Sequence, residues 1–148
     1  MTDGSPRLIF PPLGSLYRAI APYTEALIRL CAGLSLAAHG YVILFGDHQA
    51  FANFFERAGF SPGMLWVYVT GLVQFAGGLC LALGLFTRLA AVPVLIFLLT
   101  ALDYHRQFGF FWDVRGFEYP LFWAIVVFHF LVRGGGQWSL DQKIGYEV

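Results

Sequence analysis

Charged side chains are absent from a long apolar stretch in the middle of the chain. Thirty consecutive residues, Ala58 to Thr87, carry no formal charge. Within them, the roughly 24 positions from Gly63 to Phe86 would form a helix of ~36 Å, longer than the ~30 Å hydrocarbon core of a bilayer. A soluble helix of this length would carry a polar face, whereas this one has only Thr70 and Gln74 in its middle. The pattern predicts a transmembrane helix. Because a polar side chain is costly inside a membrane, the presence of Gln74 in the middle of this helix needs an explanation.

Three further apolar stretches predict three more crossings. They run from Tyr23 to Phe45, from Leu89 to Leu102 and from Tyr119 to Val132. The middle one is short, so its helix is expected to continue through Asp103 toward Phe108. The last is expected to begin near Glu118, with Pro120 tolerated in its first turn. Because backbone groups in lipid must be hydrogen-bonded within their own segment, the predicted fold is all-α, a transmembrane four-helix antiparallel bundle.

The predicted helices divide the chain into three parts. These are an N-terminal tail or interfacial segment (residues 1–22), a four-helix transmembrane domain (23–133) and a C-terminal cytoplasmic tail (134–148). The first part contains prolines and no continuous apolar run, so it does not fit a cleavable signal peptide. The second and third helices are expected to meet at Thr87 and Arg88 in an antiparallel hairpin. Loops are expected at 46–62 and 109–117.

The composition indicates a membrane environment, and the positions of the basic residues indicate an orientation in it. Hydrophobic residues make up 58% and charged residues 12% of the chain, about half the charge of an ordinary soluble domain. Membrane lipids are therefore the expected surroundings, and a net charge of zero offers no basic surface for nucleic acid. One expected side carries Arg7, Arg18, Arg88, Arg133 and Lys143, and the other carries Arg57, Arg106 and Arg115. This bias favours both termini in the cytoplasm.

Four polar side chains are predicted to share one depth in the membrane. They are His39, Gln74, Asp103 and Glu118. Distances are counted along each helix from its predicted cytoplasmic end, which is Arg88 for both Gln74 and Asp103. Each of the four residues lies ~21–24 Å from that end. Helical spacing also predicts that His39 and Glu118 belong to inward-facing stripes. Because polar groups inside a membrane usually face the bundle interior or a wet cavity, this level is the predicted site.

Each of these residues also has a purely structural interpretation. Gln74 can hydrogen-bond across helices as packing, and Glu118 suits the positive end of a helix dipole. Asp103 can mark the membrane boundary. His39 is the hardest to explain by packing alone, because it stands inside the apolar sequence LSLAAHGYVILF.

Redox groups of the chain itself are disfavoured. Cys31 and Cys80 could share a depth, but they form no C-x-x-C motif, and thiols in apolar surroundings ionise poorly. Geometry disfavours a haem between His39 and His105, since His105 points ~200° away from Asp103 and the two cannot both face fully inward. No metal-ligand spacing is found, so no metal site is predicted.

Four motifs carry a resemblance to a known family. They are AHG (38–40), QFAGGLCLALGLFTRLAA (74–91), GFFWDVRGFEYP (109–120) and GGGQWSLD (134–141). In this order they resemble the DoxX family of small four-helix membrane proteins, over roughly Leu27 to Asp141. The resemblance implies a bacterial inner membrane and a link to quinone-coupled oxidoreductases, including the membrane subunit of a thiosulfate:quinone oxidoreductase, and to complexes that handle thiol or oxidative stress.

Two positions depart from the family pattern. Relatives often carry Lys where this chain has Ile43, and Glu where it has Gln74. One charge of each sign is thereby lost, which suggests a lost interhelical ion pair. His39 and Glu118 match the family.

The leading functional interpretation is an inner-membrane subunit that binds a quinone for a partner oxidoreductase. His39 and Glu118 are the expected catalytic residues. The expected ligand-binding residues are Gln74, Asp103, Trp112, Tyr119 and Trp123. Because the chain shows no flavin or metal motif, a partner subunit is expected to supply electrons, and a homo-oligomer is compatible with the sequence.

Two other interpretations remain open at this stage. In the first, the protein is a non-catalytic membrane anchor or assembly partner for a soluble redox enzyme, and the polar level only sets helix register. In the second, it is a small-molecule carrier, for which a dimer would supply the remaining helices.

Overall fold

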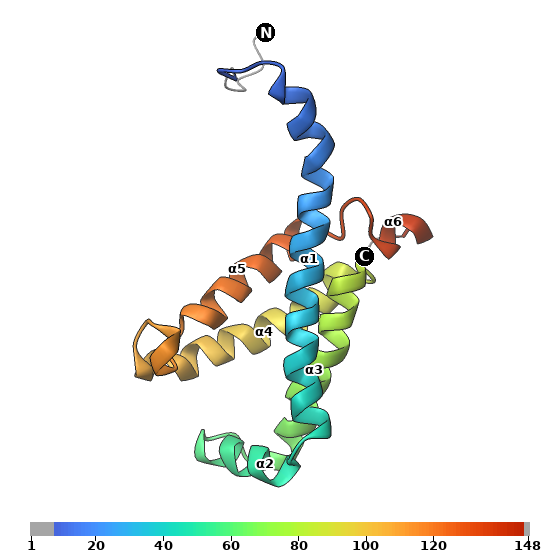
Figure 1. Ribbon diagram of the computed structural model, residues 1–148. Helices are drawn as coiled ribbons and strands as arrows, with labels where there is room; N and C mark the ends of the chain where they lie inside the picture. Colours follow the sequence, from blue (N-terminus) through green and yellow to red (C-terminus); the bar gives the residue numbers. More distant parts are fainter. Residues whose placement is uncertain (1–7, 147–148) are drawn as a thin grey trace.

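The described part of the chain is helical throughout its regular structure. The computed structural model describes residues 8–146, and no strand occurs among them (Figure 1). The helices are α1 (Leu13–Phe45), α2 (His48–Arg57), α3 (Gly63–Leu83), α4 (Thr87–His105), α5 (Glu118–Arg133) and α6 (Leu140–Ile144), with 3-10 turns η1 (Arg106–Phe108) and η2 (Trp112–Val114). The predicted all-α fold is confirmed.

Three of these segments are long and apolar enough to cross a membrane. They are α1, α3 and the continuous stretch from Thr87 to Phe108 formed by α4 and η1. The predicted extension of this helix through Asp103 is thus confirmed, as is the start of α5 at Glu118. With 16 residues, α5 measures ~24 Å, less than the hydrocarbon core. It runs antiparallel to α4 and completes the four-helix bundle (Figure 1).

The first helix is longer than expected. It begins at Leu13, ten residues before the predicted start at Tyr23, and its 33 residues span ~50 Å. Its first turns stand clear of the other helices, so part of the expected N-terminal tail is helical (Figure 1). Residues 1–7 of that tail lie outside the described part of the chain.

Small residues bring α1 and α3 into close contact. A Cβ atom added to Gly33 would lie 2.3 Å from Ala82 N, and one added to Gly40 would lie 2.2 Å from Phe75 N. Residue numbers rise along α1 as they fall along α3, so the two helices are antiparallel. Gly77, also on α3, faces α4 instead, where an added Cβ would lie 2.7 Å from Val94 Cγ2.

The second pair of helices packs on this first pair at one end and separates from it at the other. The buried core joins α1, α3, α4 and α5 through Leu36, Leu81, Ala91, Val94, Leu98, Ala124, Val127 and Phe130. Beyond the contact with Gly77, α4 diverges from α3 (Figure 1). Pro93 lies at this point, and because proline lacks an amide hydrogen it cannot bond the carbonyl of Leu89. The divergence leaves a gap near α2.

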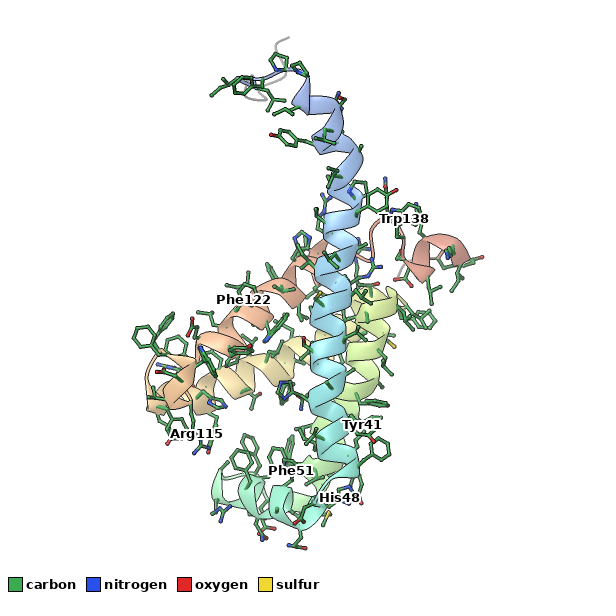
Figure 2. The ribbon with its side chains drawn as sticks, viewed as in Figure 1. Tyr41, His48, Phe51, Arg115, Phe122 and Trp138 are labelled. Atoms are coloured by element: carbon green, nitrogen blue, oxygen red, sulfur yellow. The ribbon has the colours of Figure 1, made fainter. Side chains whose placement is uncertain are left out.

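The expected loop 46–62 contains a helix that was not predicted. Asp47 caps α2 by accepting a hydrogen bond from Ala50 N at 3.0 Å. Polar side chains such as Asn53 and Arg57 are exposed, while Ala52 is buried. The other face carries phenylalanines, among them Phe51, toward the gap (Figure 2). This amphipathic pattern is typical of a helix that lies at a membrane surface.

The expected C-terminal tail is folded against the bundle. We call residues 134–145 the C-terminal cap. Arg29 on α1, 3% exposed, donates hydrogen bonds to the carbonyls of Gly135 and Trp138. Asp141 is equally buried and accepts hydrogen bonds at the start of α4. Trp138 also stacks on Tyr23, with ring centroids 5.4 Å apart (Figure 2). Residues 147–148 lie outside the described part.

Candidate functional site

A cavity of about 610 Å³ occupies the gap between α2, α3 and α4. Its wall consists of Ile43, Ala50, Phe51, Phe54, Phe55, Ala58, Phe60, Trp66, Val69, Thr70, Val73, Gln74, Pro93, Ile96, Phe97, Thr100, Ala101, Tyr104 and His105. Apolar and aromatic side chains dominate this wall. The volume and lining are those of a small-molecule site, in which a few polar groups fix the orientation of a mostly apolar ligand.

Gln74 contributes a buried amide to this cavity. Its side chain is 4% exposed, and its Nε2 donates to the carbonyl of Thr70, one turn earlier on α3, at 3.3 Å. The hydroxyl of Thr70 is itself used within the helix, since it donates to the carbonyl of Trp66 at 2.6 Å. No described residue donates to Gln74 Oε1. Gln74 therefore offers a ligand an amide oxygen and a second N–H.

His105 and Tyr104 supply polar atoms at the end of α4. His105 Nδ1 lies 2.5 Å from the carbonyl oxygen of Arg115. Because a carbonyl can only accept, Nδ1 carries the proton, and Nε2 is left as an acceptor in the neutral ring. The Tyr104 ring packs edge-on against Phe54 at 5.5 Å and against His105 at 5.3 Å. The cavity thus combines Gln74 at one end with an imidazole and a phenol at the other.

His39 lies at the depth of Gln74 but not in the cavity wall. An added Cβ on the neighbouring Gly40 would lie 2.8 Å from the backbone carbon of Gln74, so the two residues share a level as predicted. The His39 side chain is exposed, and it is not among the lining residues. The predicted inward-facing position of His39 is therefore wrong. Cys31, two turns earlier on the same stripe of α1, is exposed as well. His39 precedes the cavity-lining Ile43 by one helical turn.

Asp103 does not share the level of Gln74. The prediction counted both residues from Arg88, but α3 ends at Leu83 and α4 begins at Thr87. The centre of the turn thus lies about three residues before Arg88. Measured along the helices from this centre, Asp103 is ~10 Å farther away than Gln74 is. The Asp103 side chain is 80% exposed and pairs with Arg106, with Oδ1 3.4 Å from Nη1. His105 lines the cavity, whereas Asp103 does not.

Glu118 is part of the loop before α5. Its Oε2 accepts a hydrogen bond from Trp112 N at 3.2 Å, and its own N–H donates to the carbonyl of Phe110 at 2.9 Å. These bonds close the loop at the N-terminus of α5. Glu118 does not line the cavity, so the predicted gathering of four polar groups does not occur.

The three aromatic residues predicted to enclose a ligand form a row outside the cavity. Trp112 and Tyr119 have ring centroids 5.9 Å apart, and Tyr119 and Trp123 6.4 Å apart. Trp112 is 61% exposed, whereas Trp123 packs against the buried core. This row is typical of the aromatic belt at a membrane surface.

The two departures from the family pattern line the same cavity. Ile43 comes from α1 and Gln74 from α3. An added Cβ on Gly71, one turn before Gln74, would lie 3.2 Å from Ile43 Cγ2, which shows that the two positions are neighbours across the helix pair. The inferred loss of an interhelical ion pair is thus consistent with the geometry. An acid and a lysine here would place charges inside the cavity.

Several cavity residues were missed from the sequence. Phe51, Phe54 and Phe55 come from α2, where the pattern had been assigned to a loop. The available signal was the spacing of apolar residues within HQAFANFFER, which is helical and amphipathic. Tyr104 follows Asp103, which was weighed as a marker of the membrane boundary, and His105 was weighed only as a haem ligand.

Together these features define a multi-pass helical membrane protein with an apolar cavity near one membrane surface. Residues 25–107 match the DoxX family model. The chain is 30% identical to the uncharacterised membrane protein Rv3486 of Mycobacterium tuberculosis over 145 residues, which covers 90% of this chain and 89% of that protein. It is 26% identical over 126 residues to an uncharacterised protein of Haemophilus influenzae, covering 82% and 91%.

The chain belongs to the DoxX family. The matched residues 25–107 include every element that lines the cavity, from α1 to α4. No solved structure matches the chain.

Proposed function

We propose that the protein binds a quinone in the cavity between α2, α3 and α4 and serves as the inner-membrane subunit of a quinone-linked oxidoreductase system. The observation that carries the proposal is a single buried amide, Gln74, in an otherwise largely apolar cavity of about 610 Å³. A quinone ring is flat and apolar and carries two opposed carbonyl acceptors. Such a ring needs one hydrogen-bond donor at each end and flat side chains along its faces.

The described residues meet these needs at both ends. The free N–H of Gln74 can donate to one carbonyl, and the Tyr104 hydroxyl can donate to the other. His105 Nε2 can accept from the quinol that forms on reduction. Phe51, Trp66 and other aromatic side chains of the wall supply apolar contact with the ring.

This arrangement revises the roles expected from the sequence. Gln74 stays as a ligand-binding residue, and Tyr104 and His105 replace Asp103 and Glu118, which lie outside the cavity. Trp112, Tyr119 and Trp123 belong to the membrane-surface belt. His39 touches no wall of the cavity and has no role in this binding mode. We further propose that electrons come from a partner oxidoreductase, and that both termini face the cytoplasm.

The test is equilibrium binding of a decyl-tailed benzoquinone to the purified protein in nanodiscs, followed by quenching of tryptophan fluorescence. Gln74→Leu should weaken binding by about tenfold, because a buried hydrogen bond contributes roughly 1.5 kcal/mol. The matched control is Gln49→Leu on the exposed face of α2, which should bind as the parent does. Absence of binding to the parent protein, or equal affinity in the two variants, would overturn the proposal.

A further inference from the structure

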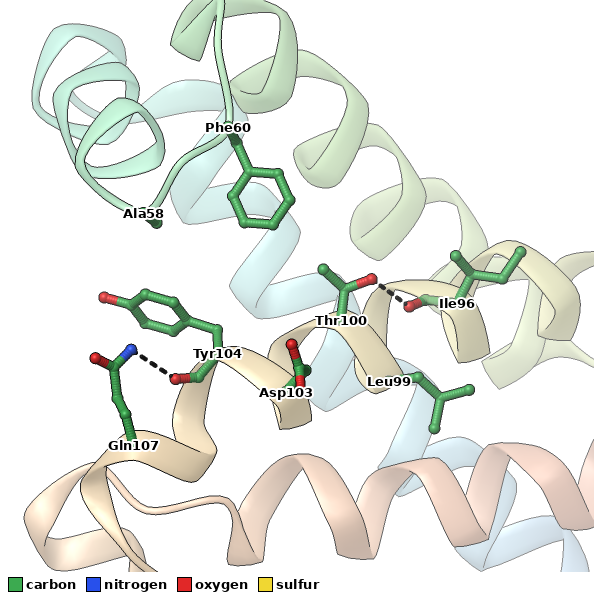
Figure 3. Close-up of a pocket in the computed structure, with 8 residues that line it drawn as sticks. All are labelled: Ala58, Phe60, Ile96, Leu99, Thr100, Asp103, Tyr104 and Gln107. Atoms are coloured by element: carbon green, nitrogen blue, oxygen red, sulfur yellow. Dashed lines mark hydrogen bonds between the residues drawn. The ribbon is translucent and has the colours of Figure 1, made fainter.

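A second hollow lies on the flank of α4, beside the cavity. It measures about 620 Å³ and is lined by Ala58, Phe60, Ile96, Leu99, Thr100, Asp103, Tyr104 and Gln107 (Figure 3). Five of these residues, Ala58, Phe60, Ile96, Thr100 and Tyr104, also line the inner cavity. The two spaces are therefore neighbours, and we call the boundary that these five residues form the wall.

The outer hollow runs along one face of α4 that is open to the membrane. Its residues on α4 and η1, from Ile96 to Gln107, recur at helical spacing over ~16 Å. Ile96 is 61% exposed and Leu99 is 51% exposed. In a membrane-spanning helix, such exposure means contact with lipid chains. Toward the end of the helix the lining becomes polar, at Asp103 and Gln107. The hollow thus follows the change from hydrocarbon to headgroups.

Side chains, rather than backbone pairing, close the wall between the two spaces. Residues 58–60 connect α2 to α3 and face α4 across the hollow (Figure 3). The backbone N–H groups of Ala58, Gly59 and Phe60 all donate back to carbonyls of α2. Among the described residues, no backbone hydrogen bond joins this connection to α4. Opening of the wall between this connection and α4 therefore requires movement of side chains such as Phe60 and Tyr104, and it breaks no backbone hydrogen bond between described residues.

The water-facing side of the cavity is closed by α2. Phe51, Phe54 and Phe55 cover that end of the cavity. The polar residues Gln49 and Asn53 lie on the opposite, exposed face and are hydrogen-bonded to each other at 3.0 Å. An apolar ligand therefore meets less obstruction from the membrane side than from the aqueous side.

We propose that the cavity is filled sideways from the bilayer, between Phe60 and Tyr104, and that its ligand is an amphiphile with a single long hydrocarbon tail. The inference rests on the proposed binding role of the cavity. The polar end of the ligand lies beside Gln74, and the tail leaves through the wall along Ile96 and Leu99. The ligand class is thus a membrane-dissolved, long-tailed molecule rather than a water-soluble one.

The experiment uses nanodiscs that contain palmitic acid with a diazirine close to its carboxyl end, the part of the molecule expected inside the cavity. After illumination, mass spectrometry measures labelling of inner-wall residues such as Val73 and Phe97. In Ile96→Trp the larger side chain blocks passage through the wall, so labelling of the inner-wall residues should fall at least fivefold. Val92→Trp, on α4, exposed and in neither hollow, is the matched control and should stay within twofold of the parent. Phe60→Ala, which opens the wall, should raise labelling about threefold.

The outcomes separate the route from the quinone proposal. Absence of inner labelling in the parent, or equal labelling in the Ile96→Trp and Val92→Trp proteins, overturns the route. If Ile96→Trp fails to fold, no rise in labelling with Phe60→Ala overturns it. Labelling that depends on the wall but is not reduced by excess decyl-tailed benzoquinone supports the route and contradicts the quinone. Labelling that excess quinone reduces but that does not change in the wall variants contradicts the route and supports quinone binding.

Discussion

Asp141 in the C-terminal cap holds the first residue of α4, Thr87. One carboxylate oxygen, Oδ2, accepts from Thr87 N at 2.9 Å and from Thr87 Oγ1 at 2.7 Å, and Oδ1 accepts from Phe86 N at 2.6 Å. The N–H of Asp141 in turn donates to the carbonyl of Gly84, the C-cap residue that follows α3. A residue 54 positions away thus acts as the N-cap of α4, and its negative charge suits the positive end of the helix dipole.

Loss of this carboxylate is expected to destabilise the bundle. Asp141→Ala leaves the buried N–H and hydroxyl of Thr87 without an acceptor, so the free energy of unfolding should fall by about 2–4 kcal/mol. Thermal unfolding of the purified protein followed by circular dichroism measures the change. Asp113→Ala in η2, an exposed carboxylate, is the control and should unfold at the temperature of the parent.

The contact between α1 and α3 predicts a strong dependence on side-chain size. An added Cβ at Gly78 would lie 2.6 Å from Ala37 N, which no rotamer change can relieve. Gly78→Val should therefore push the helices apart and cost about 3 kcal/mol or more. Ala38→Val, on the exposed face of α1, should cost less than about 0.5 kcal/mol. Similar unfolding temperatures for the two variants would contradict the packing described.

Arg29 is expected to control how firmly the C-terminal cap is attached. In Arg29→Ala the carbonyls of Gly135 and Trp138 lose the hydrogen bonds from Arg29, which weakens the attachment of the cap to α1. Limited trypsin digestion should then cut at Lys143 at least five times faster than in the parent. The exposed Arg18→Ala variant should be cut at the parental rate. Unchanged cleavage in Arg29→Ala would show that the cap is held by other contacts alone.

The cavity positions 43 and 74 are expected to be energetically coupled. Ile43→Lys or Gln74→Glu alone places an unpaired charge in an apolar cavity and should be strongly destabilising, by about 3 kcal/mol or more. The double variant restores charges of opposite sign on neighbouring helices. A double-mutant cycle on unfolding free energies should therefore give a favourable coupling of about 1.5 kcal/mol or more. Additive effects would show that the two side chains do not meet.

Hydropathy was enough to predict the long helices, because lipid imposes the same demand on every crossing. It also singled out Gln74, whose burial follows from its place in an apolar helix. The depth of Asp103 could not be counted correctly, since the turn between α3 and α4 depends on left-handed backbone at Gly84 and Phe86. Counting from Arg88 ignored this turn, and the error moved Asp103 by two helical turns.

Other features escaped prediction because they depend on contacts distant in sequence. The helix α2 has only ten residues, and its apolar face has meaning only against the cavity it covers. In the sequence, Asp141 belongs to the C-terminal tail, and only the fold brings it into contact with Thr87. Glu118 matched a family motif, but a motif does not show whether a carboxylate faces a cavity or a neighbouring backbone N–H, as it does here with Trp112.

The partners of Arg29 also set an order for biosynthesis. This guanidinium enters the membrane with the first helix, yet the carbonyls that receive its hydrogen bonds lie 106 and 109 residues later. While the ribosome is still making α3, α4 and α5, the charge has neither of these acceptors and must be hydrated or paired elsewhere. Assembly of the first helix therefore finishes only after the end of the chain has been translated, so α1 is both the first helix to be inserted and one of the last to be completed.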